Sequence, residues 1–111
     1  MQNNTTGSNN VAIGDSTLKS NTTAGGNTGL GYQSLYTNTT GERNHAIGYG
    51  ALKFNTTGNN NTASGYEALQ NNTTGTENSA FGYQAMITNV TGNYNVASGL
   101  KAMYSNTTGS N

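Results

Sequence analysis

In short segments of this chain, small residues alternate with larger residues that are polar or apolar. In the segment NHAIGYGAL (residues 44–52), Ala46 and Gly48 alternate with His45 and Ile47. Side chains of a strand point alternately to its two faces, so the small residues share one face and the variable residues share the other. We predict a strand, a turn and a second strand here. The small face is expected to pack closely, the variable face to meet solvent or a neighbouring chain, and the final leucine to lie inside.

The same pattern recurs every 17 residues without insertions. The tetrapeptide Asn-Thr-Thr-Gly, or a close variant, begins at Asn4, Asn21, Asn38, Asn55, Asn72, Asn89 and Asn106. Full units occupy residues 4–20, 21–37, 38–54, 55–71, 72–88 and 89–105, with a partial unit at each end. We predict one repeat array over residues 1–111, as a segment of a longer fibre. Because both ends fall within a unit, end-to-end stacking into a filament is the alternative.

The repeat length predicts an all-β fold. Helical repeat families need more than about 30 residues per unit, and Asn, Thr and Gly are poor residues for helix interiors. In a β-solenoid, each unit forms one coil and equivalent residues lie roughly 4.8 Å apart. One inserted residue would disturb every later column. The pattern therefore favours a β-solenoid, or parallel β-roll, with six full coils.

Three columns are predicted to build the coils, when positions are counted from each leading asparagine. Asparagine recurs at position 7 and at the leading position 1. At both positions it suits turns with left-handed backbone and can form an amide ladder from coil to coil. The ladder residues are Asn10, Asn27, Asn44, Asn61, Asn78 and Asn95. Tight packing at position 11 is assigned to Gly14, Gly31, Gly48, Gly65, Gly82 and Gly99. The core column at position 15 is Leu18, Leu35, Leu52, Leu69, Met86 and Met103.

A fourth column, at position 12, contains Tyr32, Tyr49, Tyr66 and Tyr83. Stacked tyrosines stabilise adjacent coils by packing against one another. The same row is also a candidate contact surface for sugar rings or for a host surface. The remaining tyrosines fall outside the column.

Composition narrows the function classes. Hydrophobic residues make up 31% of the chain and charged residues 7%, with a formal net charge of zero. There is no basic patch, so we expect no nucleic-acid partner. No apolar run approaches the roughly 20 residues of a membrane helix, so this segment is not expected to insert into a membrane. The chain contains no cysteine, which argues against a disulfide scaffold.

The titratable residues do not form a catalytic pattern. His45 is the only histidine and occupies a column otherwise filled by Val, Thr and Ser. The four acidic residues stand at four different positions of the unit: Asp15, Glu42, Glu67 and Glu77. Neither paired carboxylates nor a recurring set of metal ligands results. We therefore expect no enzyme activity, no catalytic or metal-binding residue and no cofactor.

The stabilisation from the few apolar residues of each coil is small compared with the entropy lost on ordering 17 residues, which indicates a homo-oligomer.

Four segments of the chain resemble the Asn/Ser-Val-Ala-Ile-Gly repeat of YadA-like head domains of trimeric autotransporter adhesins, and of related tail-fibre repeats: NVAIGDSTL, NHAIGYGAL, NTASGYEAL and NVASGLKAM. The resemblance implies a left-handed parallel β-roll packed as a homotrimer. It also implies an adhesive or structural role outside the cell, on a cell surface or in a virion fibre.

The threonines add two further hypotheses. Regular threonine columns on a flat solenoid resemble those of ice-binding proteins, although two consecutive residues of a strand point to opposite faces. Each Asn-Thr-Thr is also formally an acceptor for N-glycosylation, a match that we interpret as coincidence.

Overall fold

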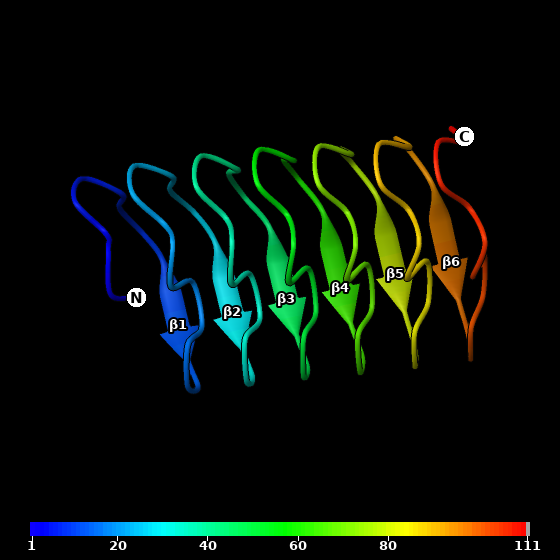
Figure 1. Cartoon of the computed structure of the whole chain (residues 1–111), viewed down its shortest axis with the longest axis horizontal. Helices are drawn as coiled ribbons and strands as arrows, with labels where there is room; N and C mark the ends of the chain where they lie inside the picture. The colour runs from blue at the N-terminus through cyan, green and yellow to red at the C-terminus, as the bar shows by residue number, and fades with distance from the viewer. Residues whose placement is uncertain (111) are drawn as a thin grey trace.

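The computed structural model describes residues 1–110 and shows an all-β solenoid with no helix in this range. Six short strands lie side by side in chain order as one parallel sheet (Figure 1). They are β1 (Val11–Ile13), β2 (Thr28–Leu30), β3 (His45–Ile47), β4 (Thr62–Ser64), β5 (Ser79–Phe81) and β6 (Val96–Ser98). The predicted fold class is confirmed at this level.

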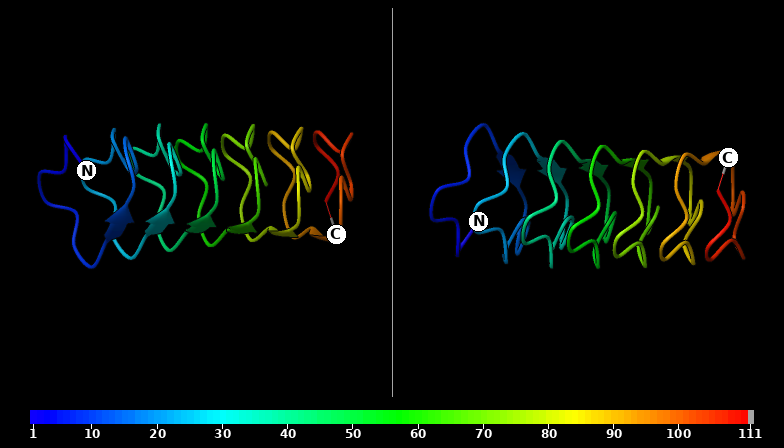
Figure 2. Two further views of the ribbon diagram at one scale, coloured as in Figure 1. Left: turned by 90° about the horizontal axis from the view of Figure 1, so that it is seen from below. Right: turned by 90° about the horizontal axis from the view of Figure 1, so that it is seen from above.

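The strand register follows the repeat. In β1 and β2, Val11 pairs with Thr28 and Ile13 pairs with Leu30, and every later pair of strands keeps the same offset of one unit. Each 17-residue unit is therefore one coil. The coils follow one another along a single axis (Figure 2), and the molecule measures 35 × 22 × 16 Å.

Each coil contains one strand, so the predicted second strand is wrong. After each strand the chain turns at the lower edge in Figure 1 and returns to the Asn-Thr-Thr-Gly corner at the upper edge. The returning segment has left-handed backbone at positions 13 and 15, with φ of 55° at Gln33 and 51° at Leu35. Extended pairing is interrupted there, but backbone hydrogen bonds between coils continue, as from the Leu35 N–H to the Ala51 carbonyl at 3.1 Å.

The predicted core column lies inside the coils. Fully buried members are Leu18, Leu35, Leu52, Leu69 and Met86, packed against the alanines of positions 9 and 14. Met103 lies in the last full coil of the described residues, and 39% of its surface is exposed there. Left-handed backbone costs about 1–2 kcal/mol for a residue with a Cβ. Burial of a leucine side chain contributes roughly 1.5–3 kcal/mol and offsets that cost.

The glycines of position 11 form one file along the axis. A Cβ on Gly14 would lie 2.7 Å from the carbonyl oxygen of Gly31, and a Cβ on Gly31 would lie 2.6 Å from that of Gly48. Their φ angles, 126° and 128°, are also unfavourable for any residue with a side chain. Both the close approach and the backbone angle require glycine, which confirms the tight-packing column.

Candidate functional site

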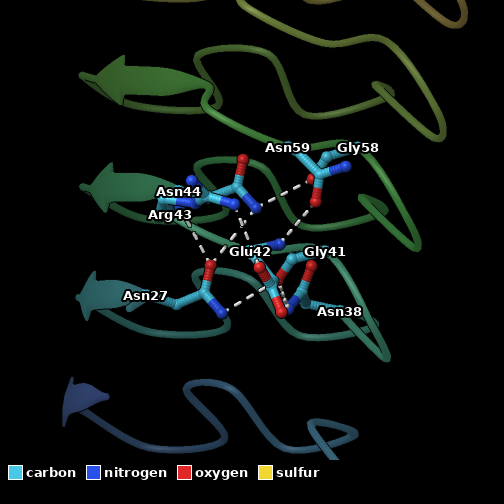
Figure 3. Close-up of polar contacts among 8 residues, drawn as sticks. All are labelled: Asn27, Asn38, Gly41, Glu42, Arg43, Asn44, Gly58 and Asn59. Carbon is cyan, nitrogen blue, oxygen red and sulfur yellow. Dashed lines mark hydrogen bonds and ion pairs between the residues drawn. The ribbon is translucent and has the colours of Figure 1, made fainter. Parts of the chain in front are cut away.

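The asparagines of position 7 form a buried amide ladder (Figure 3). The Oδ1 atom of Asn27 accepts the backbone N–H of Asn44 at 2.9 Å and the Nδ2 of Asn44 at 3.2 Å. The Nδ2 of Asn27 donates to the Gly41 carbonyl at 2.9 Å. The ladder is confirmed, but the expectation of left-handed backbone at these asparagines is wrong. The positive φ lies one position earlier, for example at Arg43 with 55°.

The leading asparagines form a second ladder, parallel to the first. The Nδ2 of Asn55 donates to Asn38 Oδ1 at 2.8 Å and to the Gly58 carbonyl at 2.9 Å. From Ala24 onward, each carbonyl at position 4 thus receives two amide donors, as Gly58 does from Asn55 and from Asn44. Every buried side-chain nitrogen and oxygen of residues 1–110 has a hydrogen-bond partner. Such bonds contribute about 0.5–1.5 kcal/mol each, and an unpaired buried group costs more.

Glycine at position 4 leaves room for the regular ladder steps. A Cβ on Gly41 would overlap with the Gly58 carbonyl and lie 2.5 Å from Asn38 Oδ1. The second unit has Ala24 at this position, and its ladder step from Asn38 Nδ2 to Asn21 Oδ1 lengthens to 3.2 Å. The repeated Asn-Thr-Thr-Gly is therefore a corner built around two amide rows.

The tyrosines of position 12 stack face to face. Ring centroids of Tyr32 and Tyr49 are 5.2 Å apart with planes at 21°, and the two later steps are 5.1 Å with planes at 7°. Desolvation beside its neighbours, the Glu67 carboxylate and the flanking phenols raise the pKa of Tyr66 above its ordinary value. The ring geometry confirms mutual stacking, while each tyrosine residue remains 41–44% exposed.

The outer face of the sheet carries apolar side chains at positions 8 and 10. Large exposed residues on this face are Val11, Ile13, Leu30, Ile47, Phe81 and Val96. In contrast, the inward residues of β3 to β6 between these positions are buried alanines. The predicted division between a variable outer face and a small inner face is confirmed.

The two threonine columns have different environments. At position 2 the hydroxyl donates to a carbonyl of the next coil, as from Thr39 Oγ1 to the Thr56 carbonyl at 3.1 Å. At position 3 the threonines are exposed: Thr6, Thr23, Thr40, Thr57, Thr74, Thr91 and Thr108. The leading asparagines from Asn21 to Asn89 are buried with their amide nitrogens hydrogen-bonded, so the folded chain does not offer these nitrogens for glycosylation.

Two tyrosines outside the position-12 column contact lysines, and the sequence analysis did not predict these contacts. The ammonium of Lys19 lies 5.5 Å from the ring centroid of Tyr36, and that of Lys101 lies 5.3 Å from that of Tyr104. Lys19 and Tyr36 occupy the same position in consecutive units, so a comparison of columns would have found this pair.

The described residues form no concave or metal-binding site. Residues 1–110 contain no pocket and no cluster of three or more His, Cys, Asp or Glu side chains that could hold a metal ion. His45 points outward from β3. The fold does not bring the four acidic residues together into such a cluster: Asp15, Glu42, Glu67 and Glu77. Arg43 and Glu42 form an exposed ion pair at 3.2 Å. Within this range, no helix has the length and apolar character needed to cross a membrane.

Comparisons of this chain with protein-family models, curated proteins and solved structures give no match. The candidate functional surfaces are therefore defined by geometry alone. They are the apolar sheet face, the tyrosine row and the exposed threonine row.

Proposed function

We propose that this chain is a segment of an extracellular structural fibre, a rigid shaft or head that holds an attachment surface away from a cell or virion. Copies of the chain pack side by side through the apolar outer face of the sheet. The observation that carries this proposal is the exposure of that face, with Ile13 at 60%, Ile47 at 44% and Phe81 at 43%. Large exposed apolar areas are typical of interaction surfaces.

A second copy of the same chain is a suitable partner for this face because it has the same coil spacing. The side chains repeat at one-coil intervals on a surface held by two amide ladders, so an identical surface has the same spacing and can pack against it coil by coil. His45 is the only titratable residue at positions 8 and 10 of the strands, so little charge must be desolvated. Three copies are favoured by the resemblance to adhesin heads.

Light scattering of the purified chain tests the assembly. We expect a mass three times the 11.5 kDa of one chain. The double variant Ile47→Lys, Phe81→Lys buries two charges in the proposed interface and is expected to be a single chain. A matched control, Thr40→Lys, Thr74→Lys, adds the same charge at the exposed corner and should keep the wild-type mass.

Two results would contradict the side-by-side assembly. One is a monomeric wild type, and the other is an unchanged mass for the Ile47 and Phe81 variant with its circular dichroism intact. A mass that increases without limit with concentration would instead indicate filaments formed by end-to-end stacking.

Ice binding is a second candidate, favoured by the seven exposed threonines of position 3. The hydroxyls of position 2 donate to carbonyls of the next coil, which leaves one row for water or ice rather than two. Thermal hysteresis with shaped ice crystals would support this function, and their absence would leave the fibre proposal alone.

A further inference from the structure

The tyrosine row occupies a different part of the surface from the proposed interface between copies. Tyr49 follows β3 by two residues, and the intervening Gly48 has a φ of 129° that turns the chain away from the strand. The turns after the strands form the lower edge of the molecule in Figure 1, opposite the Asn-Thr-Thr-Gly corners. The row is therefore available even when the sheet face is covered by another copy.

The row is regular and presents ring edges. Four rings follow each other at 5.1–5.2 Å along the axis. Because the faces of the middle rings cover one another, the 41–44% of each residue that is exposed lies mainly at its edge, where a phenol carries its hydroxyl group. A ligand would contact these edges and hydroxyl groups, not the ring faces.

Polar side chains accompany three of the four tyrosines, and the coil of Tyr49 has Gly50 at the same position. Position 13 contributes Gln33, Glu67 and Gln84, and the Nε2 of Gln84 donates to Glu67 Oε2 at 2.8 Å across one coil. Each of these residues is partly exposed. The edge thus combines a continuous row of aromatic groups with amide or carboxylate groups in three of the four central coils, and Glu67 is the only formal charge at these positions in those coils.

We propose that this edge binds an extended, uncharged polysaccharide of β-1,4-linked sugars, lying parallel to the axis of the solenoid. The rise per sugar in such a chain is close to the 5.1–5.2 Å between tyrosine rings, so each coil meets one sugar. Because neighbouring sugars of this chain are turned over by about half a turn, the same contact recurs in every second coil. Each sugar presents equatorial hydroxyl groups at its edges, which pair with the phenol hydroxyls and, where a polar side chain is present, with Gln33, Glu67 or Gln84. α-1,4-linked chains curve and lose this register within a few sugars.

The proposal deepens the attachment role given above by naming the class of surface, and it uses an edge that the assembly leaves free. Its test is co-sedimentation of the full chain with insoluble cellulose and with insoluble chitin, using granular α-1,4-glucan for comparison. We expect the chain to sediment with at least one of the β-linked polymers and to remain in solution with the α-linked polymer.

The decisive variant is Tyr49→Phe, Tyr66→Phe, Tyr83→Phe, which keeps the stacked rings and removes three hydroxyl groups. We expect its affinity for the polymer to fall by about tenfold or more, a loss of about 1.4 kcal/mol or more. The control Thr40→Val, Thr57→Val, Thr74→Val removes three hydroxyls from the opposite edge and is expected to bind like wild type.

Three outcomes would overturn the proposal. They are no sedimentation of the wild type with either β-linked polymer, equal sedimentation with the α-linked polymer, and unchanged affinity of the phenylalanine variant. The mass of the same samples by light scattering reports separately on the assembly. A trimer that does not bind polysaccharide would contradict this inference and leave the fibre proposal intact.

Discussion

At the scale of single residues, the coil is specified by small side chains and amides more than by apolar bulk. The asparagines of positions 1 and 7 are buried from Asn21 to Asn89 and from Asn27 to Asn95. Each one links its own coil to the coils on either side, as Asn44 does with Asn27, Asn61 and Gly58. These polar groups define the register because a shift by one residue would leave them unpaired in the interior.

Ala24 is the one exception in the glycine column of position 4, and it predicts a stabilising substitution. The Thr22 N–H reaches the Thr39 carbonyl at 3.4 Å, compared with 3.0 Å from Thr39 to Thr56, and the ladder beside it is also lengthened. We expect Ala24→Gly to raise the free energy of unfolding by about 1 kcal/mol, because shorter hydrogen bonds outweigh the added chain entropy. Thermal unfolding measures this change.

The reverse substitution provides the control. Gly58→Ala introduces the same overlap into a regular coil, and we expect it to destabilise the chain by about 1–3 kcal/mol, the usual cost of overpacking. An Ala24→Gly variant that melts below wild type would contradict this account of the second corner.

Predictions for single residues were confirmed where the spacing in the sequence alone determines the structure. The fixed spacing of Gly14, Gly31 and Gly48 implies one axial file, and the structure confirms it. The left-handed backbone at Leu52 could not be predicted, because local preference opposes it and only the core and the neighbouring coils favour it. Position 9 is alanine in five units and glycine at Gly29. A Cβ there would lie 2.5 Å from Thr17 Cγ2, so the larger residue at position 14 is accommodated by the smaller one at position 9.

At the scale of elements, the short strands and the tyrosine stack depend on the same coil spacing. A three-residue strand such as β3 is marginal alone, and the bonds of the corner and of the returning segment maintain the pairing around it. The strand itself was predictable from the alternation of Ala46 with His45 and Ile47. The second strand was not, since left-handed residues at positions 13 and 15 interrupt it.

The tyrosine stack predicts a dependence of stability on alkaline pH. The pKa of Tyr66 is raised in the folded chain, so the neutral phenol is favoured there. This contribution to stability is fully present below the ordinary tyrosine pKa of about 10 and is lost as the pH rises through the folded-state pKa. We expect Tyr66→Phe to reduce the loss of stability above about pH 10.

Chemical unfolding at a series of alkaline pH values measures this effect, with tyrosinate absorbance of the folded chain as a second readout. The exposed Tyr94, outside the column, offers a matched control as Tyr94→Phe. Equal alkaline losses in wild type and Tyr66→Phe would show that Tyr66 does not supply the dependence.

At the scale of the whole molecule, the array is a one-dimensional stack in which each coil contacts its two neighbours. Stability in such proteins is approximately the sum of unit and interface contributions. The described coils have the same length and register, so the number of coils is adjustable in principle, whereas the length of a coil is not.

Deletions test this property directly. Removal of residues 55–71, one whole unit, brings β3 next to β5 in register, and we expect a folded chain with a lower melting temperature. Removal of residues 55–70 shifts every later column by one position and is expected to abolish the cooperative transition beyond the third coil. Circular dichroism during heating distinguishes the two, and equal melting curves would contradict a strict coil register.

The bonds between coils, such as that from Leu35 N–H to the Ala51 carbonyl, join residues that follow one another along the axis. A tensile force applied to the two ends of the chain would therefore load only one coil's bonds at a time, at the terminal coil. Each rupture would release 17 residues, about 50 Å of extra contour length after the height of the coil is subtracted. Under load, such a tether would lengthen in equal steps and absorb mechanical work at each one while the remaining coils stayed intact.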